Sequence, residues 1–265
     1  MRKIIFIDKQ KVILDEIGVG KNIDSNTISG ETVISIISPG TELARYKDTT
    51  YPHEPGYAAI FKAERIGNNI KGIEYGDLIF CHGNHQSYQF ADKDCYIKVP
   101  KTFDLFDAIF VRFVKIFDDI NEDFYVDKIH ILGRGLIASL GRKMYAANIV
   151  PLNEAKIILD CTGKEENILK APRNSIYYLI GVPWEKTSDI MAQEVLKYIF
   201  YNKITVRSGW EKDEFNYTPT YFYNIIQNID FKDIYKVVKP EDCQEVYQEL
   251  LNNRQKLTAI FDWRK

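Results

Sequence analysis

The sequence predicts an α/β protein in which a β-rich barrel is followed by a parallel sheet covered by helices. Residues 1–100 carry strand signals punctuated by glycine, asparagine and proline, and they show almost no helical periodicity. From Lys101 onward, predicted strands alternate with predicted helices, which is typical of a parallel sheet with helices on its faces. A chain of 265 residues can form two modest domains.

The first domain is predicted to comprise residues 1–101 and 229–265. Its N-terminal part contains runs of apolar and β-branched residues bounded by turn formers, which indicate strands. These predicted strands are 3–7, 11–16, 32–38, 58–66, 77–81, 88–90 and 96–99. Its C-terminal part predicts a helix over 240–252 and a strand over 256–263.

The second domain is predicted to comprise residues 102–228. It opens with a helix that Thr102 can cap, because large apolar residues from Phe106 to Phe117 recur at helical spacing. The predicted strands of this domain are 128–132, 156–160, 175–181 and 203–208, and its predicted helices are 136–147, 188–200 and 218–228.

A glycine turn after the strand 128–132 predicts a dinucleotide site. Gly133 and Gly135 permit a tight turn and the close approach of a pyrophosphate, and Ala138 lets the following helix pack against the sheet. The backbone of Gly133, Arg134, Gly135, Leu136 and Ile137 would bind the pyrophosphate at the helix N-terminus.

The predicted dinucleotide fold lacks the strands and helices that normally stand between its first and fourth strands. A complete fold would place further strands and helices before the strand 156–160, but only about twenty residues are available. Counting from the glycines, Asn153 and Glu154 stand where an acidic residue normally binds the ribose. Topology argues against Glu154 as the ribose ligand, because that role requires 148–152 to be a strand of the parallel sheet. The segments 148–152 and 156–160 are too close in sequence for both to be parallel neighbours. We therefore expect 148–155 to be a connection and the adenosine side of the sheet to be deleted, at the cost of either a left-handed crossover or a helix that changes face.

Composition and charge exclude several classes of function. A net charge of −2 gives no basic surface for nucleic acid, and the four cysteines lack the spacing of a disulfide framework or a zinc knuckle. The N-terminus lacks the apolar core of a signal peptide, and no later run approaches a membrane span. We expect a cytoplasmic protein with a small-molecule substrate.

Several local motifs, in order along the chain, resemble the medium-chain dehydrogenase/reductase superfamily of zinc-type alcohol dehydrogenase-like proteins. The motifs are Ile37-Ser38-Pro39-Gly40-Thr41-Glu42-Leu43, Gly56-Tyr57-Ala58-Ala59, Gly76-Asp77-Leu78-Ile79 and the segment from Val238-Lys239-Pro240 to Trp263. The Ser-Pro-Gly-Thr-Glu and Pro-Gly-Tyr variants are most similar to the zinc-less branch that includes bacteriochlorophyllide a dehydrogenase. The resemblance implies a GroES-like β-barrel domain plus a truncated Rossmann domain with a parallel sheet.

Departures from the family pattern imply that zinc is absent. Pro39 stands in place of the ligand cysteine, Tyr57 in place of the ligand histidine and Ala58 in place of the glutamate, and none of the three can bind zinc. The run Cys81-His82-Gly83-Asn84-His85 offers three possible ligands without a fourth. It is open to three interpretations: a metal site, the lining of an active site, or ordinary loop polarity.

Without zinc, a side chain must exchange the proton of the substrate oxygen. The resemblance places Thr41 at the position of a proton-relay hydroxyl and Tyr57 inside the cleft, and His82 or His85 could assist because imidazole titrates near neutrality. Simpler roles are a hydroxyl bonded to backbone for Thr41 and a packed aromatic ring for Tyr57. Our hypothesis is that Tyr57 or His85 protonates the substrate oxygen.

The resemblance also implies which residues flank the nicotinamide. They follow two strands of the parallel sheet and comprise Cys161, Thr162, Gly163, Gly181, Val182 and Pro183. The cofactor is expected to be NAD or NADP, bound weakly. NADP is favoured because Arg134, Arg142 and Lys143 could hold its phosphate, although solvation is the simpler role for the last two.

Two functions are compatible with these features. The first is a zinc-independent, NAD(P)-dependent oxidoreductase that acts on a small carbonyl or alcohol. The second is a degenerate relative that has lost dinucleotide binding and acts as a binding or assembly protein, or as a non-redox enzyme. The strand 203–208 resembles the family's edge strand that pairs across a two-fold axis, which predicts a homodimer.

Overall fold

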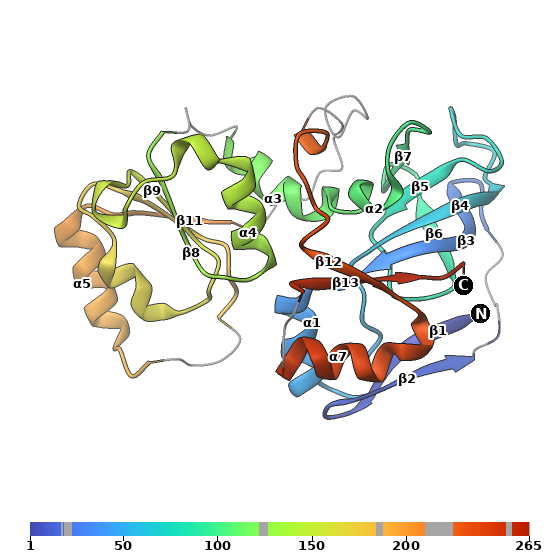
Figure 1. Ribbon diagram of the computed structural model, residues 1–265, viewed down its shortest axis with the longest axis horizontal. Coiled ribbons are helices and arrows are strands. Elements are labelled where there is room, and N and C mark those ends of the chain that lie inside the picture. Colours follow the sequence, from blue (N-terminus) through green and yellow to red (C-terminus); the bar gives the residue numbers. More distant parts are fainter. Residues whose placement is uncertain are drawn as a thin grey trace. The chain divides into compact units, whose positions relative to one another are not determined.

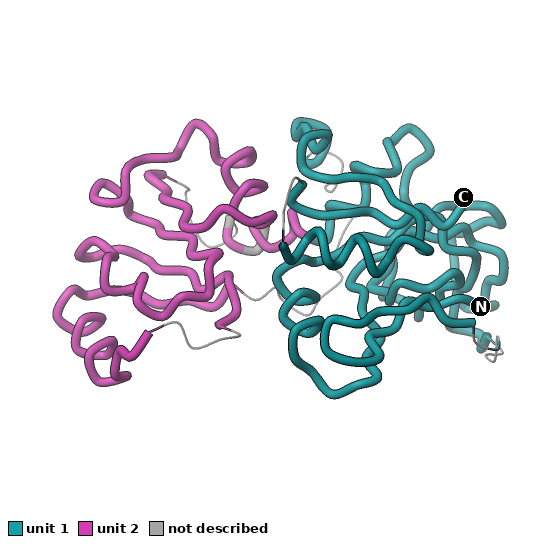
Figure 2. Tube along the Cα trace, turned by 60° about the horizontal axis from the view of Figure 1, so that its bottom comes forward, with its two compact units in different colours: residues 1–112, 214–265 teal, residues 113–213 magenta. Residues whose placement is uncertain are grey.

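The computed structural model describes residues 1–16, 18, 23–121, 127–183, 188–209, 225–252 and 256–264. The chain divides into two compact units, shown in different colours in Figure 2. Unit 1 contains Met1–Arg112 and Glu214–Lys265, and unit 2 contains Phe113–Asp213. The sequence analysis places these divisions at 101/102 and 228/229 instead. The assignment of unit 1 to substrate and unit 2 to dinucleotide stays a prediction.

A seven-stranded sheet forms the centre of unit 1 (Figure 1). Its strand order is β12-β13-β3-β4-β5-β7, and β6 also pairs with β3. Neighbouring strands are antiparallel except for β12 and β13, which are parallel. The strands are β3 (Thr27–Ile36), β4 (Ala58–Ile66), β5 (Leu78–Cys81), β6 (Tyr88–Asp92), β7 (Tyr96–Val99), β12 (Tyr235–Val238) and β13 (Thr258–Asp262). The predicted β-rich domain is confirmed, and β12 is an addition that the sequence analysis did not predict.

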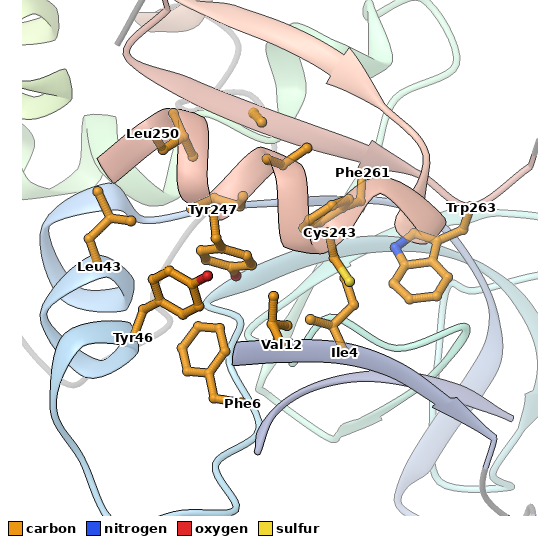
Figure 3. Packing of buried hydrophobic residues seen from close by; sticks show 13 residues of the cluster. Ile4, Phe6, Val12, Leu43, Tyr46, Cys243, Tyr247, Leu250, Phe261 and Trp263 are labelled. Carbon is orange, nitrogen blue, oxygen red and sulfur yellow. The ribbon is translucent and has the colours of Figure 1, made fainter. Parts of the chain in front are cut away.

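The main core of unit 1 lies between a hairpin and two helices (Figure 3). The hairpin consists of β1 (Arg2–Asp8) and β2 (Lys11–Glu16), and the helices are α1 (Pro39–Lys47) and α7 (Cys243–Asn252), the latter preceded by the 3-10 helix η4 (Pro240–Asp242). The ring of Tyr247 on α7 lies 4.9 Å from that of Phe6 and 5.3 Å from that of Tyr46. Contacts of this kind between large buried rings contribute strongly to stability.

Helix α1 corrects the sequence analysis, which continues the preceding strand to Ser38 and predicts no helix there. Pro39 occupies the first helical position, where its missing N–H is harmless. The carboxylate of Glu42 accepts a hydrogen bond from the backbone N of Ser38 at 2.7 Å. The buried face of the helix comprises Pro39, Glu42, Leu43 and Tyr46, which recur at helical spacing. Because Glu42 lies on the buried face, the apolar periodicity that predicts a helix is interrupted.

Unit 2 contains a four-stranded parallel sheet with the order β11-β10-β9-β8. Its strands are β8 (Ile129–Leu132), β9 (Ile157–Asp160), β10 (Ile176–Leu179) and β11 (Thr205–Ser208). The connections contain α4 (Leu136–Met144), α5 (Ala192–Asn202) and the 3-10 helices η1 (Ala146–Asn148), η2 (Leu152–Glu154) and η3 (Glu165–Lys170). The predicted parallel sheet and the α/β class are confirmed.

The helix predicted to begin near Thr102 is two helices. The first, α2 (Leu105–Ala108), begins at Asp104, whose carboxylate accepts hydrogen bonds from the backbone N of Phe106 and Asp107. The second, α3 (Val111–Asn121), carries the buried residues Phe113, Val114 and Phe117 that predicted it. The helix predicted over 218–228 lies largely outside the described residues.

Candidate functional site

A glycine turn joins β8 to α4 in unit 2. Gly133 has a φ of +112°, a conformation that residues with a side chain rarely adopt. A Cβ on Gly133 would lie 3.4 Å from atoms of Ala138 and Thr162, whereas a Cβ on Gly135 would meet no atom within 4 Å. The backbone at Gly135 is therefore open to the close approach of a ligand.

The N-terminus of α4 suits an anion. No side chain caps the helix at Gly135, and its first turn contains no acidic residue. Leu136 and Ile137 lie in the first turn of α4, and their backbone amides are at the positive end of the helix dipole. The side chain of Leu136 is buried. Arg134 is exposed beside them. The donors and the charge of this turn fit a phosphate group.

The side chain of Arg142 on α4 hydrogen bonds to the backbone at the glycine turn. Its guanidinium Nη2 donates hydrogen bonds to the carbonyl oxygens of Ile131 at 3.1 Å and Gly133 at 2.6 Å. Nη2 of Arg142 is therefore committed to the backbone, and a role of this side chain in holding a cofactor phosphate stays a prediction. Lys143 is exposed, in keeping with solvation.

The loops that follow β9 and β10 pack directly against each other. A Cβ on Gly163, whose φ is +69°, would lie 2.4 Å from the carbonyl oxygen of Val182, and one on Gly181 would lie 2.4 Å from the N of Gly163. Thr162 also contacts the glycine turn, as described above. The structure thus brings Gly133, Thr162, Gly163, Gly181 and Val182 together at the carboxyl ends of three parallel strands, where α/β sheets bind their ligands.

A buried carboxylate organises the loop after β9. Asp160 accepts hydrogen bonds from the backbone N of Thr162 at 2.8 Å, from Thr162 Oγ1 at 2.6 Å and from Tyr177 Oη at 2.5 Å. Thr162 Oγ1 in turn accepts from Asn167 Nδ2 at 2.8 Å. Because the hydroxyl of Thr162 is committed, this loop offers backbone groups to a ligand. Burial and the Asp160 hydrogen bond raise the pKa of Tyr177, so its hydroxyl stays protonated.

Cys161, which follows Asp160, is also not a reactive group. Burial raises the pKa of its thiol, and the charge of Asp160 raises it further. The thiolate is the nucleophilic form of cysteine, so a protonated thiol at this position is inert at neutral pH.

Residues 148–155 were predicted to be a connection, and hydrogen bonds tie this segment to the amino end of the sheet. Val150 N donates to the carbonyl of Ile129 at 2.9 Å, and Lys156 N donates to the carbonyl of Lys128 at 2.9 Å. Ile149 forms an isolated parallel bridge with Ile129. Glu154 lies between these two anchors, while Gly133 lies at the opposite end of β8. The four residue steps from Ile129 to Gly133 span about 13 Å, so Glu154 is too remote to bind a ribose at the glycine turn.

A fully buried hydrogen-bond network in unit 1 contains His85. Trp263 Nε1 donates to Ser35 Oγ at 2.9 Å, and Ser35 Oγ lies 2.8 Å from His85 Nδ1. His85 Nε2 lies 3.0 Å from Glu42 Oε2, which also accepts from Tyr247 Oη at 2.5 Å. The His85 ring has no exposed surface. Both of its nitrogens are engaged, so His85 supports the fold and is not placed to exchange a proton directly with a substrate.

Tyr57 is partly exposed and lies against a buried arginine. The guanidinium of Arg112, which is 5% exposed, lies 4.0 Å from the centroid of the Tyr57 ring, and the two side chains also hydrogen bond. Burial lowers the pKa of Arg112, while its contacts with Tyr57 act in the opposite sense. A cation stacked on an aromatic ring is attracted to the ring face and restricts the orientation of the ring. Of the four predicted catalytic residues, Tyr57 is partly exposed and packs against a buried cation, whereas His85 is fully buried.

The structure places the remaining predicted catalytic residues as follows. Thr41 is half-buried in the first turn of α1. His82 is exposed, and its ring meets that of Phe80 edge-on at 6.3 Å. Gly56 packs against the backbone of Asn84 and His85, so the segment before Tyr57 and the segment of His85 are neighbours.

The residues at the positions where the resemblance would place zinc ligands cannot bind a metal. Pro39 and Ala58 are buried and carry no ligand atom. Burial raises the pKa of the Cys81 thiol to about 12, so it is not a thiolate ligand near neutral pH. Within the described ranges, no group of three or more His, Cys, Asp or Glu side chains is arranged to hold a metal ion. The described part of the chain also contains no helix of the length and hydropathy needed to cross a membrane.

Arg112 and Tyr247 were not identified from the sequence. Arg112 left a detectable signal, because it interrupts an otherwise apolar stretch between Val111 and Val114. No local sequence pattern points to Tyr247, because its partner Glu42 is 205 positions away in sequence.

Comparisons with known proteins identify the fold. No family model matches the sequence, and no curated protein matches it. Among solved structures, galactitol-1-phosphate dehydrogenase from Escherichia coli matches with a TM-score of 0.82 and 11% identity, covering 99% of this chain and 100% of that chain. Alcohol dehydrogenase TADH from Thermus sp. ATN1 matches with a TM-score of 0.80 and 12% identity, covering 99% of each chain.

A third match was solved with a cofactor. CAD from Helicobacter pylori complexed with NADP(H) has a TM-score of 0.80 and 13% identity, covering 100% of this chain and 98% of that chain. At these identities the likeness shows a shared fold. The structural neighbours are dehydrogenases, and the chain has their architecture.

Proposed function

We propose that this protein is a cytoplasmic, zinc-independent oxidoreductase that uses a nicotinamide cofactor on a small carbonyl or alcohol. The observation that carries the proposal is the convergence of Gly133, Thr162, Gly163 and Gly181 at the carboxyl ends of β8, β9 and β10. An open glycine backbone at a helix N-terminus fits the phosphate of such a cofactor. The dehydrogenase fold supports the same conclusion.

In this proposal the residues of unit 2 bind and orient the cofactor. The backbone amides of Gly135, Leu136 and Ile137 would hold its phosphate, with Arg134 adding positive charge. The backbone of the loops at 161–163 and 181–183 would line the nicotinamide, and Asp160 fixes the first of these loops. The bound cofactor supplies hydride transfer.

Tyr57 is our proposed proton donor. Its phenol would exchange a proton with the substrate oxygen, and Arg112 holds the ring and stabilises the developing phenolate. His82 and Thr41 are the remaining candidates for a relay to solvent. Pro39, Tyr57 and Ala58 offer no zinc site, which is the basis for proposing catalysis without zinc.

The cofactor proposal is tested by thermal unfolding of the purified protein with NAD, NADH, NADP or NADPH at millimolar concentration. A ligand that binds the native state raises the melting temperature. We expect at least one of the four to raise it. If none does, the chain is a relative that has lost cofactor binding.

We also propose that two copies pair through β11. In the described residues this strand pairs with β10 alone, and Val206 on it is 37% exposed. An edge strand with an exposed apolar residue can pair with the same strand of a second copy. Light scattering during gel filtration should give twice the mass of 30.8 kDa. A mass of one chain at micromolar concentration would exclude the dimer.

A further inference from the structure

We propose that the cofactor site recognises a nicotinamide mononucleotide unit, and that the adenosine half of a dinucleotide adds little to its affinity. This inference rests on the proposed function, since it concerns the same site. It names which part of the cofactor the protein holds. Its basis is the topology of the unit 2 sheet.

The sheet contains one complete mononucleotide-binding half. Dinucleotide folds consist of two such halves, and the cofactor lies across the point where the strand order reverses. In unit 2, β9, β10 and β11 form one half in the order expected for it. From the other half only β8 and α4 are present in the described chain, together with the bridge of Ile149 to Ile129. In the described residues, the half that would hold adenosine contributes only the strand β8 to the sheet.

The free edge of β8 is closed by other groups. Alternate carbonyls of a parallel strand face opposite neighbours. Those of Lys128 and Leu132 accept hydrogen bonds from Lys156 N and Cys161 N, on the side of β9. The carbonyl of Ile129 faces the other side and accepts from Val150 N at 2.9 Å, as the carbonyls of Ile131 and Gly133 accept from Arg142.

Arg142 therefore occupies the hydrogen-bond positions that a second strand would fill. A strand cannot pair with β8 there while the guanidinium binds both carbonyls. The three carbonyls on this edge, those of Ile129, Ile131 and Gly133, are thus bonded without a further strand.

The acidic residue that would bind the adenosine ribose is also misplaced. Glu154 is held near Ile129 and Lys128, about 13 Å along β8 from the glycine turn. By contrast, the groups that would bind the phosphate and the nicotinamide lie together, because Gly133, Thr162, Gly163 and Gly181 are in contact or nearly so. The contacts that remain match the mononucleotide half of the cofactor.

The test compares the affinities of reduced nicotinamide mononucleotide and NADH for the full-length protein by isothermal titration calorimetry. We expect dissociation constants within about tenfold of each other, since a well-bound adenosine would contribute far more than that. We also expect that adenosine at millimolar concentration does not displace NADH. A preference for NADH above tenfold, or displacement by adenosine, would overturn the inference.

The outcomes also separate this inference from the proposed function. If NADH binds and the mononucleotide does not, the proposed function stands and the inference fails. If neither reduced compound binds, the inference fails, and the proposed function fails with it if NAD, NADP and NADPH do not bind either. The variant Glu154→Gln is the control: it should leave the NADH affinity unchanged, whereas a loss of tenfold or more would show that Glu154 binds ribose and that an adenosine site exists.

Discussion

The guanidinium of Arg142 lies 2.6 Å from the carbonyl oxygen of Gly133, and this hydrogen bond ties helix α4 to the turn that precedes it. The same nitrogen binds the carbonyl of Ile131. In a complete sheet these carbonyls would face a neighbouring strand. A single side chain on a helix thus stabilises both the sheet edge and the backbone conformation of the candidate cofactor site.

Replacing Arg142 by methionine should destabilise unit 2. The variant keeps most of the apolar stem but leaves two carbonyls without their charged donor, which costs about 1–3 kcal/mol in the free energy of unfolding. Urea denaturation measures this loss, and NADH affinity should fall with it. The neighbouring exposed Lys143 provides the control, because Lys143→Met should change the stability by less than about 0.5 kcal/mol. Equal effects of the two substitutions would contradict the role of Arg142.

Replacing Tyr247 by phenylalanine should destabilise unit 1. The change removes the hydroxyl that donates to Glu42 in a site without exposed surface, and it leaves a buried carboxylate short of one hydrogen bond. The expected loss is about 1–3 kcal/mol in the free energy of unfolding. Tyr75→Phe is the matched control, since Tyr75 is 72% exposed. A Tyr247→Phe protein as stable as the wild type would show that the network is dispensable.

The stability of unit 1 should depend on the protonation of Asp107. Burial, together with the charges of Asp104 and Asp230, raises the pKa of Asp107 to about 6 from its ordinary value of 3.8. Between these two values the folded state binds more protons than the unfolded state, so the stability falls as the pH rises from 4 to 6. The variant Asp107→Asn has no ionisable group at this position, so this loss of stability is absent from it.

Urea midpoints at pH 4 and pH 7 test the prediction. The urea midpoint of Asp107→Asn minus that of the wild type should be larger at pH 7 than at pH 4. An unchanged difference between the two proteins at both pH values would show that Asp107 does not titrate in this range.

The substitution Tyr57→Phe should abolish most catalysis while leaving cofactor binding intact. General acid–base catalysis by one side chain contributes about 100-fold to 10,000-fold, so kcat should fall by at least about 100-fold. The measurement uses NADPH or NADH oxidation with the small aldehyde or ketone that the wild type reduces fastest. Arg112→Met should give a smaller decrease in kcat, since Arg112 acts through Tyr57. Full activity of Tyr57→Phe would remove Tyr57 from the mechanism.

The sequence predicted most of the strands because local patterns determine them. The bounds of β2, β4 and β7 agree with their predictions, since each is an apolar or β-branched run between turn formers. Helix α1 escaped detection because Pro39 and Gly40 suggest a loop and because Glu42 lies on its buried face. The shortened sheet was predictable from chain length alone, since the residues between β8 and β9 are too few for a further strand and its crossover.

The site was less predictable than the fold. The glycine turn is a local motif, so its geometry followed from sequence. His85 illustrates the opposite case, because its partners Ser35 and Glu42 are 50 and 43 positions away and only the folded structure shows that the ring is buried. Glu154 satisfied the sequence spacing for a ribose ligand, but the backbone bonds of its neighbours hold it at the wrong end of β8.

The most direct test of the account is calorimetric titration of NADH into the wild-type protein and into Gly135→Asp. A Cβ at position 135 meets no atom within 4 Å, and aspartate is a favoured residue before a helix, so the variant should unfold at a temperature no lower than the wild type. Its carboxylate would occupy the N-terminus of α4 and repel the cofactor phosphate. We predict that the wild type binds NADH and that Gly135→Asp binds it at least about tenfold more weakly. Equal affinities would contradict a cofactor site at this turn, and so would a wild type that binds neither NADH nor NADPH.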